Sequence, residues 1–366
     1  MKIALLIPIY EPSDKVLPFL SSFSPEDFDY FLAVNDGSGE QYQAIFDALE
    51  TQTPFKVISY PENHGKGHAL KTGMKALIEE HPDLDYIVTA DSDGQHSLVD
   101  INRVKEEAKN AVDTLFLGSR GFEKDNVPFK SRFGNRFSAA YFRMASGKKI
   151  RDTQTGLRAI PSCLFDLALK TPGSRFEFEM NFLLAAVREA PLTEVPIETI
   201  YEDQGEKHVT HFRPFQDSIR IYKTPLLYLL VSLASFGIDI GLFHLFSTFV
   251  FTEALEQRVF ISALIARILS GCFNFLMFHF VVFGRKEHIG KSAIRYIFLW
   301  TINYFLSSGL TYVFTFVPLA LSFIKVLVDI FLAIVNYLVN LTWVFAKKRR
   351  RIKAEKKMKE GVNDEN

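Results

Sequence analysis

The stretch YIVTADSDGQH spans residues 86–96 and decides the fold of the first half of the chain. Its apolar run, Tyr86–Ala90, has the length and composition of a buried strand and stops at Asp91. A second carboxylate, Asp93, follows two residues later. Two acids directly after a strand are either hard oxygen ligands for a divalent cation or solvated turn residues, so the neighbouring sequence must decide between these interpretations.

Four other apolar runs resemble the run at 86–90. They alternate with helix-length segments and lie at Ile3–Ile9, Tyr30–Val34, Phe55–Tyr60 and Thr114–Leu117. This βαβ rhythm predicts an α/β fold with a mostly parallel, Rossmann-like sheet and helices on both faces. In such sheets ligands bind beyond the carboxyl ends of the strands. Each run ends in polar or turn residues, so we expect these ends to converge on one rim.

Charge and hydrophobicity are divided unevenly along the 366 residues. Residues 1–224 contain 26 Lys and Arg against 33 Asp and Glu, and residues 225–366 contain 16 against 9, so net charges of −7 and +7 cancel. Most of the second half is apolar outside one loop and the tail. The division predicts a soluble domain at 1–224, a membrane domain at 225–346 and a basic tail at 347–366. We expect no nucleic-acid partner, and the two cysteines predict no disulfide framework.

Seven motifs follow one another through the first half. They are IPIYEP (7–12), VNDGS (34–38), NHGKGHALKTG (63–73), ADSDGQH (90–96), GSR (118–120), DTQTGLRAI (152–160) and RFEFEMN (175–181). With these motifs the chain resembles the family 2 glycosyltransferases of the GT-A fold, and within them the polyprenyl-phosphate sugar synthases such as dolichyl-phosphate mannose synthase. The QxxRW motif of processive synthases is absent, so we do not expect polymer synthesis.

The resemblance implies a donor site and a metal site at the rim. The residues that would hold the nucleotide are Pro8, Tyr10, Glu11, Asn35 and Asp36, and those that would bind Mg²⁺ or Mn²⁺ are Asp91, Asp93 and Gln95. The family commonly has Asp-Asp where this chain has Asn-Asp, which puts the contact at Asn35 in question. The glycine-rich turn at Gly65 and Lys66 could approach phosphates through its backbone or be an ordinary strand-to-helix turn.

The resemblance also implies a lipid acceptor, a polyprenyl phosphate such as undecaprenyl phosphate. A lipid phosphate is already an anion, so transfer needs positioning and charge neutralisation more than a general base. Arg120 and Arg132 match family positions that contact the acceptor phosphate, and Asn135 falls where the family can have a small hydroxyl residue. Asp152 and Glu179 match acidic positions near the reaction centre. The alternative for each arginine is a surface salt bridge.

Two segments combine aromatic stripes with basic residues, as helices at a membrane interface do. In the first, four aromatics recur every fourth residue, at Phe129, Phe133, Phe137 and Tyr141. The second, HFRPFQDSIRIYKT at 211–224, lies directly before an apolar span. These stripes predict contact with membrane lipids, with packing against the sheet as the alternative.

Four largely apolar stretches, near 225–251, 259–283, 293–317 and 321–346, are long enough to span a bilayer. Lys and Arg are concentrated in the loop at 284–295 and in the run that follows the last stretch. The positive-inside rule then predicts a multi-pass protein of the cell membrane, with the catalytic domain and the C-terminus in the cytoplasm.

An internal repeat relates the second and fourth stretches, because NFLMFHFVVFGRK (274–286) aligns with NYLVNLTWVFAKK (336–348) without a gap. Two such hairpins resemble the GtrA family of small four-helix membrane proteins, which is associated with moving polyprenyl-phosphate sugars across membranes. Asp239 and Arg267 could pair inside the bundle, where polar groups either line a pathway or only hold helices together. Because four helices are few to enclose a pathway, assembly into a homo-oligomer is one alternative.

These features predict a membrane glycosyltransferase that moves one sugar, with inversion, from a nucleotide diphosphate sugar to polyprenyl phosphate. UDP-glucose is the favoured donor because fused GtrA-like domains resemble glucosylation systems. One alternative is use of GDP-mannose, as in dolichyl-phosphate mannose synthase, with a membrane domain that only anchors the enzyme. The other is a lipid-linked sugar translocator as the main role.

Overall fold

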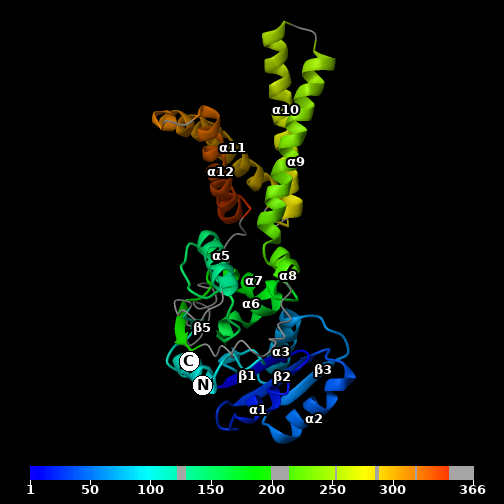
Figure 1. The fold of residues 1–366 in the computed structure, drawn as a ribbon, viewed down its shortest axis with the longest axis vertical. Helices are drawn as coiled ribbons and strands as arrows, with labels where there is room; N and C mark the ends of the chain where they lie inside the picture. The colour runs from blue at the N-terminus through cyan, green and yellow to red at the C-terminus, as the bar shows by residue number, and fades with distance from the viewer. Residues whose placement is uncertain (122–128, 199–213, 252–253, 285–287, 318–319, 346–366) are drawn as a thin grey trace, which may run out of the picture. The chain divides into compact units, whose positions relative to one another are not determined.

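The computed structural model describes residues 1–121, 129–198, 214–251, 254–284, 288–317 and 320–345 (Figure 1). Within helices, the side chains of residues 129–133, 214–215, 256, 308, 321–322 and 325 are outside this description. The chain forms two compact units, Met1–Ile221 and Tyr222–Asn366.

A mixed sheet of seven strands forms the centre of the first unit, in the order β3-β2-β1-β4-β6-β5-β7 among the described residues. The strands are β1 (Ile3–Ile9), β2 (Tyr30–Asp36), β3 (Lys56–Tyr60), β4 (Tyr86–Thr89), β5 (Leu115–Arg120), β6 (Arg158–Pro161) and β7 (Leu192–Ile197). Only β6 runs antiparallel to its neighbours in this sheet. The predicted mostly parallel α/β architecture is confirmed.

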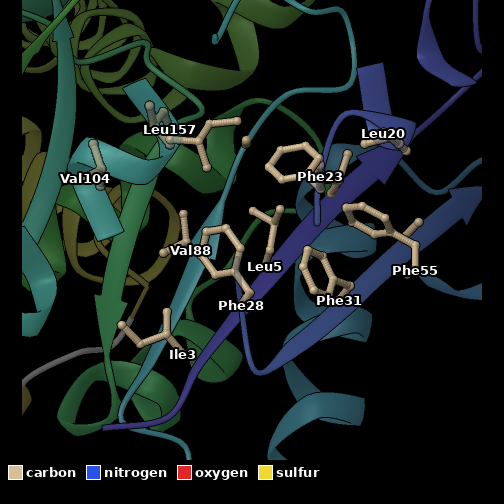
Figure 2. Packing of buried hydrophobic residues seen from close by; sticks show 14 of the residues in the cluster. Ile3, Leu5, Leu20, Phe23, Phe28, Phe31, Phe55, Val88, Val104 and Leu157 are labelled. Atoms are coloured by element: carbon tan, nitrogen blue, oxygen red, sulfur yellow. The ribbon is translucent and has the colours of Figure 1, made fainter. Parts of the chain in front are cut away.

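Helices pack against both faces of the sheet. The helices of this unit are α1 (Val16–Ser21), α2 (Gln43–Gln52), α3 (Lys66–Glu80), α4 (Leu98–Lys109), α5 (Phe129–Ser146), α6 (Phe165–Lys170), α7 (Glu177–Ala186) and α8 (Pro214–Ile221), and α1 to α4 are among those that contact the strands. Alternate residues of β1, such as Leu5, pack with Leu20 of α1 and Val104 of α4 (Figure 2). Leu6 points to the other face, against Gly73 of α3. Because β1 is buried on both faces, its sequence is continuously apolar instead of alternating.

Strand β6 brings a distant segment to the rim where β4 and β5 end. Arg158, the first residue of β6, pairs with Thr89 at the end of β4 and with Leu117 in β5. Residues 152–157 therefore cross the carboxyl ends of both parallel strands. This four-residue strand, like β7, was not among the predicted apolar runs.

Helix α5 forms where an interfacial helix was predicted, but its aromatic residues do not share one environment. Phe137 is 54% exposed, whereas Tyr141 is only 8% exposed. Asn135, Ser138 and Phe142 are also buried, so this side of α5 packs inside the unit. The prediction of one lipid-facing aromatic stripe is therefore wrong at Tyr141, while the side chains of Phe129 and Phe133 lie outside the description.

The second unit contains α9 (Lys223–Leu245), α10 (Leu255–Met277), α11 (Ile289–Val313) and α12 (Leu321–Val339). With short extensions, four helices in the described residues are long and apolar enough to cross a membrane: Lys223–Val250, Gln257–Val282, Ile289–Phe316 and Val326–Val344. The predicted four apolar helices are confirmed. The basic tail at 347–366 lies outside the described residues.

The internal repeat is visible in local geometry. Helix α10 continues into a π-helical turn at Phe278–Val282, and α12 continues into one at Asn340–Val344. These turns occupy the same positions in the sequence alignment. The residues that follow them, Phe283 and Phe345, stack with ring centroids 4.7 Å apart. Two equivalent hairpins thus meet at their matching ends.

Each hairpin also holds a carboxylate through a serine of its partner helix. In the first, Ser270 donates a hydrogen bond to Asp239 (2.9 Å), and Arg267 lies 3.5 Å from the same carboxylate. In the second, Ser307 donates to Asp329 (2.7 Å). The predicted pairing of Asp239 with Arg267 is confirmed, and it compensates charge that would be costly in lipid.

Candidate active site at the sheet rim

Lys66 connects two carboxylates at the rim. Its ammonium lies 2.6 Å from Oδ1 of Asp91, just beyond β4, and 3.0 Å from Oε1 of Glu179 in α7. The side chains of Lys66, Asp91 and Glu179 are 17%, 26% and 10% exposed. Strand β4, the first residue of α3 and the first turn of α7 therefore contribute to one shielded ionic cluster.

This cluster is arranged to hold positive charge. Burial opposes the ionised form of Asp91, but Lys66 and His96 outweigh it and hold the pKa of Asp91 well below its usual range. Burial likewise opposes the charge on Lys66, and the two carboxylates still raise its pKa. Partial removal from water and the charge of Asp91 raise the pKa of Asp93. A cation near both aspartates would relieve their repulsion.

Close contact with Gly156 positions the Asp91 carboxylate. The backbone at Gly156 lies so close to both carboxylate oxygens of Asp91 that a Cβ there would clash with them. Thr89 holds the backbone in position, because its hydroxyl donates a hydrogen bond to the Gly156 carbonyl (2.9 Å). The glycine of the motif DTQTGLRAI is therefore required by close approach.

A second cation–carboxylate pair lies along the same segment. Arg120 donates from Nε and Nη2 to the fully buried Asp152, at 2.6 and 3.1 Å, in a bidentate arrangement. Asp152 precedes Gly156 by four residues, a reach of at most ~14 Å. The Arg120–Asp152 pair and the Lys66–Asp91 pair therefore belong to one rim, as the sequence predicted.

The two residues at the end of β2 are engaged by their own chain. The buried Asp36 carboxylate accepts hydrogen bonds from the Tyr60 hydroxyl (2.7 Å), the Asn63 amide (3.0 Å) and the Gly65 backbone N–H (2.9 Å). Asn35 accepts from the backbone N–H of Ser38 (2.9 Å) and donates to Ser59 (3.3 Å). Both residues thus shape the loops of the rim, and their contact with a nucleotide stays a prediction.

The end of β1 has an unusual backbone. Glu11 has φ of 45°, in the left-handed region that a residue with a side chain seldom adopts, and its N–H donates to the Ser38 hydroxyl (2.9 Å). The pKa of Tyr10 is raised, mainly by burial and to a lesser extent by the neighbouring Glu11. Pro8 pairs with Val34 inside the sheet. Such local strain is concentrated at ligand sites, which agrees with the predicted nucleotide contact at Glu11 without testing it.

The predicted acceptor residues of α5 are only partly described. The side chain of Arg132 lies outside the described residues, although its backbone is helical. Asn135 is buried and donates a hydrogen bond to the Arg151 carbonyl (2.6 Å). Asn135 therefore fastens α5 to the segment that carries Asp152, next to Arg120.

Two site residues were not assigned roles from the sequence. His96 is buried, with Nε2 3.6 Å from Oδ2 of Asp91. Glu194 of β7 accepts hydrogen bonds from the Ser119 hydroxyl (2.9 Å) and the Arg151 N–H (2.7 Å), which ties β5 to the segment before Asp152. His96 closes the motif ADSDGQH and could have been selected from it, whereas Glu194 has no local signal.

The donor set at Asp91 fits a divalent cation that is shared with a ligand. The described residues contain no group of three or more His, Cys, Asp or Glu side chains arranged around a metal site. Asp91 and Asp93 offer hard oxygen atoms, and the Gln95 N–H holds Asp93 with a hydrogen bond of 3.0 Å. Mg²⁺ is commonly held by one or two carboxylates together with substrate phosphates, so this sparse set suits Mg²⁺ or Mn²⁺ beside a diphosphate.

Comparison with known proteins identifies the first unit. Residues 5–167 match the model of glycosyl transferase family 2. The UDP-N-acetylglucosamine–dolichyl-phosphate N-acetylglucosaminyltransferase of Methanococcus voltae is 30% identical over 219 residues, which cover 55% of this chain and 86% of that protein. An uncharacterized protein of Methanocaldococcus jannaschii is 28% identical over 224 residues, covering 58% and 88%.

Among solved structures, glucosyl-3-phosphoglycerate synthase from Mycobacterium tuberculosis is similar to this chain. In its complex with Mn²⁺, UDP-glucose and glycerol 3-phosphate it is 16% identical, with a TM-score of 0.46, over 63% of this chain and 79% of that chain. Its complex with Mg²⁺ and UDP gives 15% identity and a TM-score of 0.43.

A GT-A domain with an acidic rim, followed by four long apolar helices, defines a glycosyltransferase. The chain belongs to glycosyl transferase family 2. The predicted fold and enzyme class are confirmed. The matched stretches cover the first half of the chain, and the GtrA-like assignment of the second half stays a prediction.

Proposed function

We propose that this glycosyltransferase moves one sugar from a nucleotide diphosphate sugar to the phosphate of a polyprenyl lipid. The observation that carries the proposal is the presence of two cation–carboxylate pairs, Lys66–Asp91 and Arg120–Asp152, on one rim. The first pair belongs to a site for a departing diphosphate, and the second belongs to a site for an attacking phosphate. Four apolar helices in the same chain suit a lipid acceptor.

On the donor side, Asp91 and Asp93 would hold Mg²⁺ or Mn²⁺, with Gln95 beside them. When bound, the cation neutralises charge on the leaving diphosphate. Lys66 adds a second positive group within the cluster, and Gly65, whose N–H is taken by Asp36, would let the nucleotide approach closely because it has no side chain. Glu11, Tyr10, Pro8 and the loop shaped by Asp36 would surround the nucleotide.

On the acceptor side, Asp152 fixes the plane of the Arg120 guanidinium by its two hydrogen bonds. Arg120 and Arg132 would position the lipid phosphate. A phosphate oxygen then attacks the anomeric carbon and forms a new C–O bond, while the bond from that carbon to the diphosphate oxygen breaks. The leaving group departs from the opposite face, so the reaction inverts the anomeric centre. No general base is needed because the acceptor is already ionised.

The donor is proposed to be a UDP-sugar, with UDP-glucose favoured. The Methanococcus voltae relative is named for UDP-N-acetylglucosamine, which supports the same nucleotide with a different sugar. GDP-mannose is the alternative. The lipid is proposed to be undecaprenyl phosphate or a related polyprenyl phosphate, met at the cytoplasmic face of the cell membrane.

A donor panel tests this proposal. Purified protein with short-chain polyprenyl phosphate and Mn²⁺ should transfer radiolabelled sugar from one of UDP-glucose, UDP-galactose, UDP-N-acetylglucosamine or GDP-mannose into a lipid fraction. Asp93→Asn should reduce that transfer by at least about 10²-fold. Chelation of the metal should have a similar effect, reversed by Mn²⁺.

Two results would contradict the proposal. Transfer to protein or glycan but not to lipid would refute the acceptor, and full activity of Asp93→Asn would refute the metal assignment. The matched control is Asp47→Asn, an exposed acid on α2 that should not change transfer.

Translocation of the product is a second candidate function, favoured by the Asp239–Arg267–Ser270 contacts within a largely apolar hairpin. Full-length protein with Asp93→Asn can be placed in vesicles that contain supplied lipid-linked sugar. Product that becomes accessible on the opposite side only with protein present supports translocation. Product that stays on its side, with the protein shown to be inserted, leaves the membrane unit as an anchor.

A further inference from the structure

The acid that would carry the metal already has a cation beside it. Lys66 Nζ lies at hydrogen-bond distance from Asp91 and also contacts Glu179. Neither contact is a loose surface pair, because the three side chains are mostly shielded from water. Asp91 follows β4 and Glu179 belongs to α7, so the ammonium bridges two elements that are far apart in the sequence.

The backbone around Lys66 is held firmly. Gly65 precedes it with φ of 97°, and a Cβ there would press on Arg175. Gly67 follows it and is packed tightly against the Cβ of Phe178. With closely packed glycines on both sides, α3 cannot shift to move the ammonium. Any change of partner must occur within the flexible four-carbon side chain of Lys66.

The charges of the cluster favour such a change. Asp91, Asp93 and Glu179 bring three carboxylates against one ammonium, so a divalent cation is attracted to the site. A divalent cation on Asp91 would nevertheless be close to the ammonium, and like charges at short range repel strongly in a shielded site. The ammonium of Lys66 and the divalent cation therefore cannot both stay next to the Asp91 carboxylate without strong electrostatic repulsion.

We propose that Lys66 is an internal counter-cation that occupies the metal-binding carboxylate until metal and donor arrive together. This inference rests on the proposed metal-dependent function. Binding of the divalent cation displaces the ammonium from Asp91, and the displaced ammonium takes the donor diphosphate as its new partner while Glu179 keeps it nearby. Metal and nucleotide therefore bind with positive coupling, and the metal alone binds weakly.

This role separates Lys66 from a lysine that only contacts the nucleotide. A simple nucleotide contact would leave the affinity for metal alone unchanged when it is removed. A counter-cation instead competes with the metal, so its removal strengthens binding of the metal alone and weakens the coupling to nucleotide. By linkage, the factor by which UDP strengthens Mn²⁺ binding equals the factor by which Mn²⁺ strengthens UDP binding.

The test measures Mn²⁺ binding to full-length protein in nanodiscs by electron paramagnetic resonance, with and without UDP. Lys66→Met should bind Mn²⁺ without UDP about tenfold more tightly than the unmodified protein does, and UDP should add less to that affinity. Lys66→Arg keeps the charge and should retain weak binding of Mn²⁺ alone. Lys75→Met, an exposed position on the same helix, is the matched control and should behave as the unmodified protein.

Thermal unfolding establishes that each variant is folded, and Lys66→Gln replaces Lys66→Met if the methionine is not tolerated. Mn²⁺ affinity of the neutral variants equal to or weaker than that of the unmodified protein would overturn this inference, while UDP-dependent Mn²⁺ binding would leave the proposed function standing. If no protein, including the unmodified one, bound Mn²⁺ even with UDP, the metal assignment itself would fail, and this inference with it.

Discussion

Gly156 and Asp91 are in such close contact that only a hydrogen atom fits on the glycine α-carbon. The contact joins two distant motifs, DTQTGLRAI and ADSDGQH, at the point where β4 and β6 begin to pair. The Gly156 backbone thus limits where the Asp91 carboxylate can lie, and Lys66 forms an ion pair with the same carboxylate.

Gly156→Ala should therefore displace Asp91. We expect transfer to fall by about 10–100-fold, since small displacements at a reacting centre are costly, and the free energy of unfolding to fall by about 1–3 kcal/mol. Initial rates and thermal unfolding measure the two effects. Gly290→Ala has open space around its new Cβ and is the control. Unchanged rates in Gly156→Ala would show that the site tolerates movement of Asp91.

Asp36→Asn tests whether this carboxylate shapes the rim. The carboxylate accepts several hydrogen bonds from the loop before α3, and an amide cannot accept all of them. We expect a loss of about 2–4 kcal/mol in stability and a higher KM for the donor. Chemical denaturation and donor titration check both. An altered KM with unchanged stability would instead indicate direct contact with the nucleotide.

The ionisation of Asp91 predicts a pH dependence of stability. Asp91 has a lower pKa in the folded protein than in the unfolded chain, so the unfolded chain binds more protons as pH falls. Its stabilising contribution is complete above the ordinary pKa of 3.8 and is lost as pH falls through that value toward the folded one. As pH falls from about 5 to about 2, the unmodified protein should lose stability more steeply than Asp91→Asn. Thermal melts followed by circular dichroism measure stability at each pH. If the prediction is wrong, the two proteins will lose stability in parallel as pH falls.

Substitutions of the Asp239–Arg267 pair test whether the pair has a structural role or a transport role. Asp239→Leu leaves Arg267 without that partner in an apolar helix and should lower stability in detergent by about 1–2 kcal/mol. The double variant Asp239→Leu, Arg267→Leu should regain most of the loss. If it also moves lipid-linked sugar across vesicles as well as the unmodified protein does, the pair only holds the hairpin together.

The parts predicted from sequence are those in which local pattern and environment coincide. Strand β1 is apolar at every position because it is buried on both faces, and Asp91 lies two residues after the end of β4. The missed strand β6 has only four residues, and its burial depends on strands formed elsewhere. No local pattern could pair Lys66 with Glu179, which are more than a hundred residues apart. Such contacts form only when distant segments of the chain fold together at the rim.

The segment from Asp152 to Gly156 supports Arg120 at one end and Asp91 at the other. A substitution aimed at the proposed acceptor site would therefore disturb the proposed donor site as well if it moved this short span.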